Sequence, residues 1–330
     1  MANESLTEKA LKLLNEKSVK ARAMAKQAIL EEKTGIKKVD EAVEQYLSRW
    51  NDTTRPGMLS LACEAAGGNP EEAVPLQAAL LFIDATMDIH DDIIDESIAK
   101  KNRKTLYGKL GKEATLLLGD GFMVKGFSHL QIALENLPKD RSLKIIDEVN
   151  HFLSEVVEAH LSEASLKAKK WSVKPEVYLQ VLTKKASDIE GRMKIGAIYG
   201  GGSAGSVEAL SRYGRNIGVL LAVKSEFVDI FEPSELMHRI KYEVFPLQVL
   251  YALQSRKHGT RIREILQKDC LRQEDCDELI ETICATKGFI SLSQLLNNLE
   301  KEAIQVLNVL PNSQIKMELQ LLAASLTEDL

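Results

Sequence analysis

The chain has 330 residues, 45% of them hydrophobic, which is enough for a sizeable core in one large domain or two modest ones. The formal net charge is only −5 with both signs interspersed, so charge gives no case for nucleic-acid binding. No apolar stretch reaches ~18 residues without a charge, and we expect no transmembrane segment. The first residues lack a basic region followed by an apolar one, so no secretory signal is expected. Four cysteines without paired metal spacing favour reduced thiols and a cytoplasmic location.

No segment alternates as a strand does, and the sequence predicts an all-α chain forming a single domain over residues 1–330. Ser5 or Thr7 can cap the first helix. We expect helices over residues 6–31, 39–50, 58–66, about 73–96, 113–134, 138–169, 174–199, 207–230 and 236–254, with charged helices beyond. Loops or breaks are expected at 31–38, 51–57, 67–70 and 200–202, and near Gly259, Gly288 and Pro311.

The helix expected near 73–96 ends in an acidic stretch. Helical spacing places Asp91 and Asp95 one above the other, with Asp92 turned by about 100°. Stacked carboxylates repel each other unless a cation lies opposite. Mg²⁺ prefers oxygen ligands and commonly bridges one or two carboxylates to a substrate phosphate. Because Lys100, Lys101, Arg103 and Lys104 follow at once, the stretch predicts a metal–diphosphate site.

A solvated acidic helix end with a basic loop is the ordinary alternative for such a charge run. Against it, isoleucines are interleaved with the acids, and Asp84 and Asp88 extend the same face upstream. We therefore favour an interior groove. Cys270 and Cys276 lie six residues apart, but a metal pair is disfavoured because no histidine or second cysteine pair is nearby.

Residues 89–97, IHDDIIDES, resemble the first Asp-rich motif, DDxxD, of the trans-isoprenyl diphosphate synthases. Residues 111–120, GKEATLLLGD, resemble the segment that follows this motif in the family. Arg55 and Pro56 resemble the end of the upstream GGKRxRP motif, Lys185 stands where a KT lysine is expected, and EVFPL at 243–247 resembles the KxTLP region. The chain is identified by these motifs as a divergent member of this polyprenyl synthetase family.

The resemblance implies a single large helical bundle around a central cavity, usually a homodimer. It also implies a prenyltransferase that uses Mg²⁺ to bind an allylic diphosphate between two Asp-rich helices. Isopentenyl diphosphate then attacks the allylic carbon as the diphosphate leaves, and a proton is lost. Such chemistry needs a dry, apolar cavity so that water does not quench the allylic cation.

The resemblance assigns roles to particular residues of this chain. The catalytic set is Asp91, Asp92, Asp95 and Lys185, and the metal ligands are Asp91, Asp95, Glu226 and Asp229. The substrate diphosphates would be held by Arg55, Lys100, Lys101, Lys185 and Lys241. Phe82, Thr86 and Met87 precede the first motif by a helical turn or more, and they would set a product of ~C20 or longer.

The chain departs from the family pattern at several of these sites. The second Asp-rich motif is SEFVD at 225–229, in which Ser225 replaces the leading aspartate. Asp52 stands where a lysine is expected, and Asp84 stands where a histidine is expected. Lys100 and Lys101 stand where the family has paired arginines, and a lysine lacks the bidentate fork that suits phosphate. Lys241 is one residue away from the position of the lysine expected before the TLP segment.

Three functions fit this mixture of matches and departures. We favour an active, divergent synthase, because a dead site has no need for three aspartates together. The second is a non-catalytic or weakly catalytic subunit that supports an active synthase in a heteromer. The third is a helical interaction protein without chemistry. A terpene cyclase is disfavoured because its ligand set is absent after Asp229.

Overall fold

The computed structural model describes residues 4–100 and 103–328. Over these residues the regular secondary structure is helical apart from one pair of two-residue strands, which confirms the all-α class. None of the described helices is both long and apolar enough to cross a membrane. The chain divides into two compact units, residues 1–148 with 192–207 and residues 149–191 with 208–330. The single domain expected from the sequence stays a prediction.

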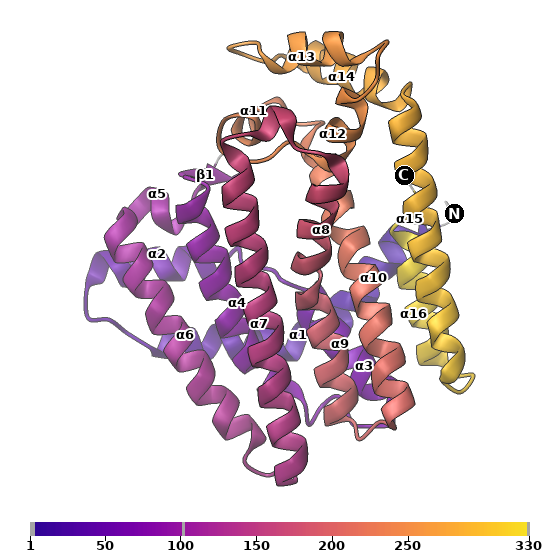
Figure 1. Ribbon diagram of the computed structural model, residues 1–330. Helices are drawn as coiled ribbons and strands as arrows, with labels where there is room; N and C mark the ends of the chain where they lie inside the picture. The colour runs from indigo at the N-terminus through magenta and orange to yellow at the C-terminus, as the bar shows by residue number, and fades with distance from the viewer. Residues whose placement is uncertain (1–3, 101–102, 329–330) are drawn as a thin grey trace. The chain divides into compact units, whose positions relative to one another are not determined.

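Unit 1 is organised around helix α4, which packs side by side with α6 (Figure 1). Its elements are α1 (Leu6–Glu31), α2 (Lys37–Leu47), α3 (Thr54–Ala65), α4 (Val74–Ile94), β1 (Ala99–Lys100), β2 (Arg103–Lys104), α5 (Leu106–Leu110) and α6 (Lys112–Leu134). Parts of α7 (Lys139–Lys167), α9 (Ser187–Tyr199) and α10 (Ala204–Asp229) also belong to it. Buried side chains of α1, α2, α4, α5 and α6 form one apolar core. The sequence predicted α1, α4, α6 and α7 to within a few residues.

Helix α1 begins at a capping box. Ser5 Oγ accepts from the Glu8 N–H at 3.1 Å, and the Glu8 carboxylate accepts from the Ser5 N–H at 2.9 Å. Of the two candidate caps in the sequence, Ser5 is therefore the one used.

Helix α3 begins earlier than the sequence indicated, because Thr54 to Gly57 were expected in a loop and are helical. Proline is tolerated in a first helical turn, where its missing N–H has no intrahelical partner. The Asp52 carboxylate accepts from the N–H groups of Thr54 and Arg55 at 3.0 and 3.1 Å. Asp52 thus holds the start of α3, where a negative charge also suits the helix dipole.

Helix α4 ends in a Schellman motif. The Ser97 N–H donates to the Asp92 carbonyl at 2.8 Å, and the Glu96 N–H donates to the Ile93 carbonyl at 3.3 Å. Glu96 has φ of 52°, the left-handed conformation that glycine usually supplies at this position. The chain then reverses into the β1–β2 hairpin, in which Lys100 pairs with Arg103. This reversal brings Lys100 back to the acidic end of α4.

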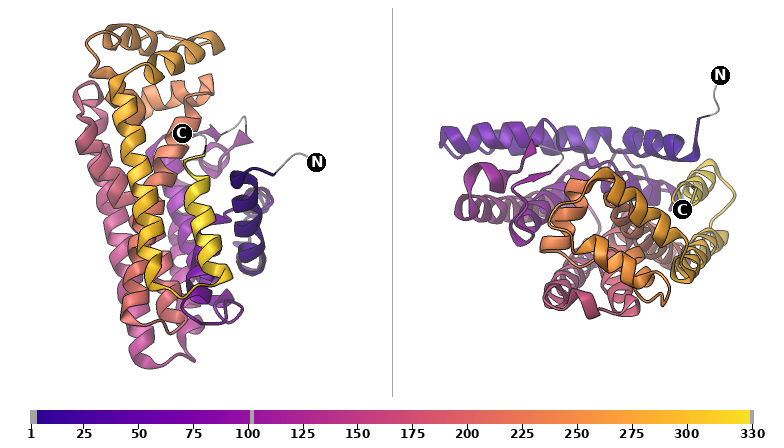
Figure 2. Two further views of the ribbon diagram at one scale, coloured as in Figure 1. Left: turned by 90° about the vertical axis from the view of Figure 1, so that its right-hand side faces the viewer. Right: turned by 90° about the horizontal axis from the view of Figure 1, so that it is seen from above.

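Unit 2 comprises the rest of α7, α9 and α10 and the helices that complete the chain. These are η1 (Lys170–Ser172), α8 (Pro175–Lys185), α11 (Pro233–Tyr242), α12 (Leu247–Leu253), α13 (Gly259–Leu266), α14 (Gln273–Cys284), α15 (Lys287–Val306), η2 (Leu307–Val309) and α16 (Gln314–Ser325). Helices α15 and α16 run side by side in opposite directions, as the left view of Figure 2 shows.

Two segments that the sequence predicted as continuous helices are interrupted. The segment 174–199 breaks at Ala186, between α8 and α9. Helix α10 approaches this break closely, because a Cβ on Gly218 would lie only 2.7 Å from the Ala186 Cβ. The segment 236–254 was wrongly predicted as one helix, because α11 ends at Tyr242 and α12 starts after Pro246. Pro246 lacks the N–H that a continuous helix requires. The turn before Pro233, in contrast, is as expected and returns α11 against the end of α10.

We predict that Glu96→Gly stabilises the protein by about 1 kcal/mol, because glycine adopts the left-handed C′ conformation without a Cβ clash. The urea midpoint of unfolding measures the change. Glu96→Ala is the control: it keeps the Cβ and should give no such gain. Equal midpoints for the two variants would contradict strain at Glu96.

Candidate functional site

The acidic end of α4 forms the first part of the candidate site. Asp91 and Asp95 are half-buried, whereas Asp92 is buried. The Lys100 Nζ lies 2.7 Å from the Asp92 Oδ1. Burial raises the pKa of Asp92 against the opposing effect of Lys100. Burial alone would lower the pKa of Lys100, but Asp92 more than compensates and raises it. The predicted grouping of Asp91, Asp92, Asp95 and Lys100 is therefore present in unit 1, while Lys101 lies outside the described residues.

Arg55 lies deeper in unit 1, among three carboxylates. Its Nη1 is 2.8 Å from the Asp52 Oδ2, its Nε is 3.8 Å from the Asp84 Oδ1, and its Nη2 is 3.7 Å from the Asp88 Oδ1. The same oxygen of Asp84 forms an ion pair with Arg192, a fully buried residue of α9. The guanidinium expected to hold a diphosphate is thus already in ion pairs within the protein. Arg192 was missed by the sequence analysis, because nothing in its surroundings marks it as Asp84's partner.

Asp88 lies one helical turn beyond Asp84. Partial burial raises its pKa to about 6, although Arg55 opposes this shift. Its side chain is still 41% exposed, so solvent screens part of the effect.

The three residues expected to set product length lie on α4 against α6. Phe82 is 1% exposed, with its ring stacked on His129 at 5.0 Å and edge-on to Phe122 at 6.2 Å. Thr86 is buried and donates a hydrogen bond to the Gly119 carbonyl at 3.0 Å, and Met87 is half-buried. These contacts make Phe82 and Thr86 core residues of the α4–α6 packing. Their role in product length stays a prediction.

The second acidic stretch lies at the end of α10 in unit 2. Asp229 Oδ2 accepts a hydrogen bond from the Arg239 Nε at 2.9 Å and lies 2.7 Å from the Arg239 Nη2. Glu226 is 5% exposed, and its Oε1 lies 3.7 Å from the Arg239 Nη1. Burial raises the pKa of Glu226. Both acids expected to bind metal therefore lie beside one arginine, which the sequence analysis missed. Their role as metal ligands stays a prediction.

Lys185 belongs to a second network of unit 2. Its Nζ lies 2.6 Å from the Glu163 Oε2, and the Tyr178 hydroxyl lies 3.0 Å from the Glu163 Oε1 and 2.5 Å from the Glu226 Oε1. A hydroxyl carries one proton and can donate to only one of the two carboxylates. Burial would raise the pKa of Glu163, but Lys185 outweighs this and lowers it. The hydroxyl thus lies between Glu163 and Glu226 and links the Lys185 network to the end of α10.

Glu163 was not among the predicted site residues, because a glutamate in the charged sequence of α7 resembles a solvated one. Lys241 is exposed, with its Nζ 4.8 Å from the centre of the Tyr242 ring. Cys270 is exposed and Cys276 is buried, and both are free thiols.

The donor set at the end of α4 fits Mg²⁺ shared with a diphosphate. Over the described residues, no group of three or more His, Cys, Asp or Glu side chains is arranged to hold a metal ion by itself. Mg²⁺ commonly takes only one or two carboxylates and completes its shell with phosphate oxygens and water. Asp91 and Asp95, half-exposed and one turn apart, supply that number of carboxylates.

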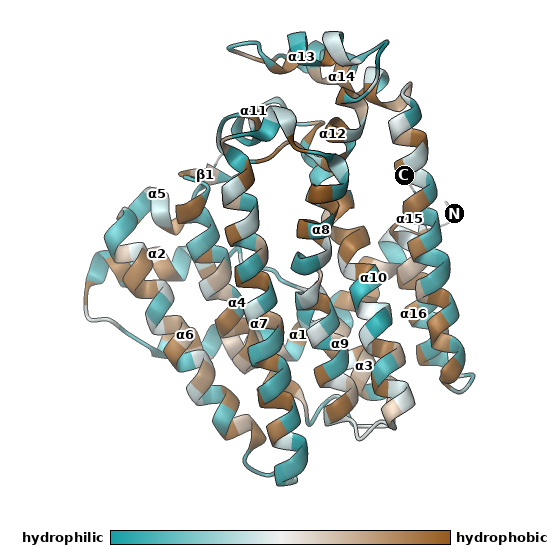
Figure 3. Cartoon of the chain, viewed as in Figure 1, coloured by the Kyte–Doolittle hydropathy of each residue, from teal (hydrophilic) through white to brown (hydrophobic). Residues whose placement is uncertain are grey.

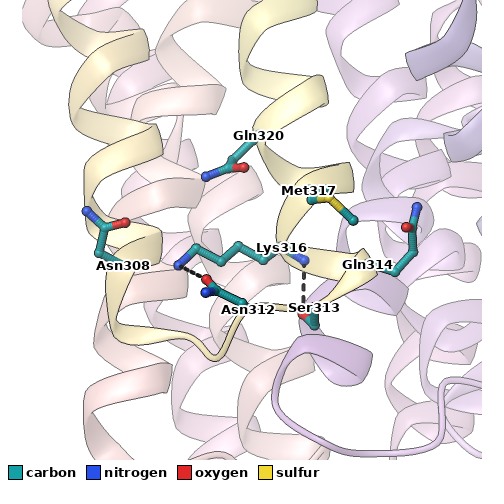
Figure 4. Close-up of a pocket in the computed structure, with 7 residues that line it drawn as sticks. All are labelled: Asn308, Asn312, Ser313, Gln314, Lys316, Met317 and Gln320. Atoms are coloured by element: carbon teal, nitrogen blue, oxygen red, sulfur yellow. Dashed lines mark hydrogen bonds between the residues drawn. The ribbon is translucent and has the colours of Figure 1, made fainter.

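Two surface hollows lie away from these residues. One, of about 530 Å³, is formed by Asn308, Asn312, Ser313, Gln314, Lys316, Met317 and Gln320 (Figure 4). There Lys316 donates to the Leu310 carbonyl at 3.2 Å and to the Asn312 side chain at 3.4 Å. The other, of about 500 Å³, is lined by Lys26, Leu30, Lys33, Glu44, Leu47 and Ser48. Neither hollow contains a predicted site residue.

Comparison with known proteins links the chain to one family. A model of the polyprenyl synthetase family matches residues 36–283. The chain is 32% identical to a geranylgeranyl diphosphate synthase of Methanosarcina mazei over 57% of each chain. It is 26% identical to a short chain isoprenyl diphosphate synthase of Methanothermobacter thermautotrophicus, over 81% of this chain and 83% of that one. The match thus spans little more than half the length of the first of these relatives.

Solved structures show the same fold. A geranylgeranyl pyrophosphate synthetase from Pyrococcus horikoshii superposes with a TM-score of 0.84 at 23% identity, covering 97% of this chain and 98% of that chain. A polyprenyl synthase from Caulobacter crescentus, complexed with calcium and isoprenyl diphosphate, gives a TM-score of 0.80 at 17% identity, covering 99% of each chain.

The raised pKa of Asp88 predicts a pH-dependent stability. An unfolded aspartate titrates near pH 3.9, so the folded chain binds this proton more tightly between about pH 4 and 6, and the contribution of Asp88 to stability falls as pH rises through that window. Asp88→Asn removes the charge. We expect its melting temperature to exceed that of the wild type by on the order of 1–2 °C at pH 7, and the difference to vanish near pH 4.

Asp147→Asn, at an exposed position of α7, is the control and should show no such trend. A difference between Asp88→Asn and wild type that does not change with pH would contradict the shift.

Proposed function

The chain belongs to the polyprenyl synthetase family, and we propose that it is a Mg²⁺-dependent prenyltransferase. It condenses isopentenyl diphosphate with an allylic diphosphate, head to tail, to give a longer trans-prenyl diphosphate. The observation that carries this proposal is the acidic end of α4, where two half-exposed aspartates lie beside a Lys100–Asp92 ion pair. The names of the relatives support it.

Asp91 and Asp95 would hold the metal, which when bound neutralises the charge that develops on the leaving diphosphate. Lys100, fixed by Asp92, presents a positive charge at the same helix end and binds the allylic diphosphate. The allylic carbon–oxygen bond breaks, the double bond of isopentenyl diphosphate forms the new carbon–carbon bond, and a proton is lost to the departing diphosphate. Lys185, fixed by Glu163, is proposed as a further diphosphate ligand.

We propose a product of about C20. Two relatives are named for geranylgeranyl or short-chain products, and the residue one turn before the first motif is the small Thr86 and not an aromatic one. Phe82, packed on α6, would close a deeper floor. Chain-length analysis of the products of Phe82→Ala tests this, because an unchanged length removes Phe82 as the floor.

A homodimer is proposed from the surface of α6. Large apolar side chains are exposed along this helix, at Leu116, Leu117, Val124, Phe127 and Ile132. Hydrophobic turns alternate with hydrophilic ones along it (Figure 3). A second copy of the chain would cover these side chains. Analytical sedimentation should then detect a dimer, and a monomer would contradict the proposal. A cytoplasmic location is proposed from the four free thiols.

We predict that Asp91→Ala lowers kcat/KM by at least ~100-fold, because one metal ligand is lost where charge develops. The assay incubates the purified chain with Mg²⁺, radiolabelled isopentenyl diphosphate and each allylic diphosphate from C5 to C20. EDTA should abolish product formation, and Asp147→Ala should leave it unchanged. If the wild type forms no product but binds the allylic diphosphate with Mg²⁺, the chain is instead a supporting subunit of a heteromer.

Asp52 limits the affinity for isopentenyl diphosphate, since it holds Arg55 at 2.8 Å. Asparagine at this position keeps an oxygen that can cap α3 but removes the competing charge. We therefore predict that Asp52→Asn lowers the KM for isopentenyl diphosphate by roughly tenfold, equivalent to about 1.4 kcal/mol.

The KM for the allylic substrate should not change in Asp52→Asn. Adding Arg55→Gln should abolish the gain. An unchanged KM for isopentenyl diphosphate in Asp52→Asn would remove Arg55 as its ligand.

A further inference from the structure

The end of α10 carries two carboxylates that the family resemblance assigns to a metal, yet a guanidinium already lies on them. Arg239 places two N–H groups on one oxygen of Asp229, at 2.9 and 2.7 Å. Its Nη1 lies 2.9 Å from the Glu243 Oε2 and 3.7 Å from the Glu226 Oε1. Three carboxylates thus surround one arginine, whose side chain is only 14% exposed.

The oxygens of Glu226 have further protein partners. Oε1 accepts from the Tyr178 hydroxyl at 2.5 Å, and Oε2 accepts from the Leu247 N–H at 3.1 Å. Leu247 is the first residue of α12, so Glu226 satisfies a backbone donor at that helix start. Glu226 therefore contributes to packing α8, α10 and α12 together within unit 2.

The local sequence explains how the arginine reaches the acids. Helix α10 ends at Asp229, and Pro233 starts α11 after a short turn. Arg239 lies in the last turn of α11, and Glu243 is its C-cap. The i, i+4 pair of Arg239 and Glu243 holds the guanidinium from its own helix, while Asp229 holds it from α10.

We propose that Arg239 is the resident cation of the second acidic stretch, so that no divalent metal binds at Glu226 and Asp229. Mg²⁺ needs oxygen ligands at about 2.0–2.1 Å in near-octahedral geometry. The guanidinium occupies Oδ2 of Asp229 and cannot lose its proton to make way. A metal on that oxygen would have to displace a buried cation, and a metal on the other oxygen would lie against the positive charge of Arg239.

This inference deepens the proposed function and rests on it only in taking Asp91 and Asp95 as the metal ligands. It implies that the chain binds its metal at the end of α4, and that a fixed arginine neutralises the carboxylates at the end of α10 in place of a metal. The number of metal ions per chain is then lower than two acidic stretches would suggest.

Equilibrium dialysis tests the inference, with Mn²⁺ and inorganic pyrophosphate present on both sides of the membrane. The bound metal is the excess of Mn²⁺ in the compartment that contains the protein. We expect Asp91→Asn to lower the number of bound Mn²⁺ ions and Asp229→Asn to leave it unchanged. A fall in bound Mn²⁺ with Asp229→Asn would overturn the inference. No change with Asp91→Asn would instead count against the metal site of the proposed function.

Arg239→Gln supplies the converse test. Removing the guanidinium leaves three carboxylates together, so we expect about one additional Mn²⁺ per chain, and that gain should disappear in Arg239→Gln/Asp229→Asn. Arg215→Gln is the matched control, because Arg215 also joins two carboxylates of unit 2, Glu155 and Glu190. An equal gain in the control would overturn the specific role of Arg239.

Should Arg239→Gln fail to fold, as circular dichroism would reveal, the comparison of wild type with Asp229→Asn still decides the question.

Discussion

Carboxylates removed from water need a cation beside them, and this constraint shapes both acidic regions of the protein. An isolated buried charge costs several kcal/mol, so each acid must find a partner, take up a proton or keep contact with solvent. Asp84 pairs with the buried Arg192, Glu226 accepts from the Tyr178 hydroxyl beside Arg239, and Asp91 stays half-exposed.

The two acidic regions solve the problem differently, and the difference has a functional consequence. In unit 2 the cation is a side chain of the protein itself, Arg239, which forms an ion pair with Asp229. In unit 1 the last turn of α4 presents Asp91 and Asp95 at a helix end, and the Schellman reversal returns Lys100 to Asp92. The first arrangement is complete without a ligand. The second has the chemistry to take a metal together with an anionic substrate.

The sequence predicted what depends on local spacing and could not predict what depends on distant partners. Helical periodicity and the cap at Ser5 located α1 and α4, and the Asp91–Asp95 register followed from 3.6 residues per turn. The Arg192–Asp84 and Arg239–Asp229 pairs were not predictable in this way, because long-range ion pairs leave no periodic signal. The break at Pro246 was predictable from proline chemistry and was overlooked.

Asp52 shows why a departure from a family motif is better interpreted through its contacts than through its charge. A carboxylate where a lysine is expected would by itself suggest a lost anion site. In this fold Asp52 accepts two backbone N–H groups at the start of α3, where the helix dipole favours a negative charge and would disfavour a lysine. The same carboxylate holds Arg55 in place. If Arg55 holds the second diphosphate, as proposed, the substitution would exchange some affinity for that substrate for a fixed helix start and a fixed arginine, which would leave a working site with a higher KM.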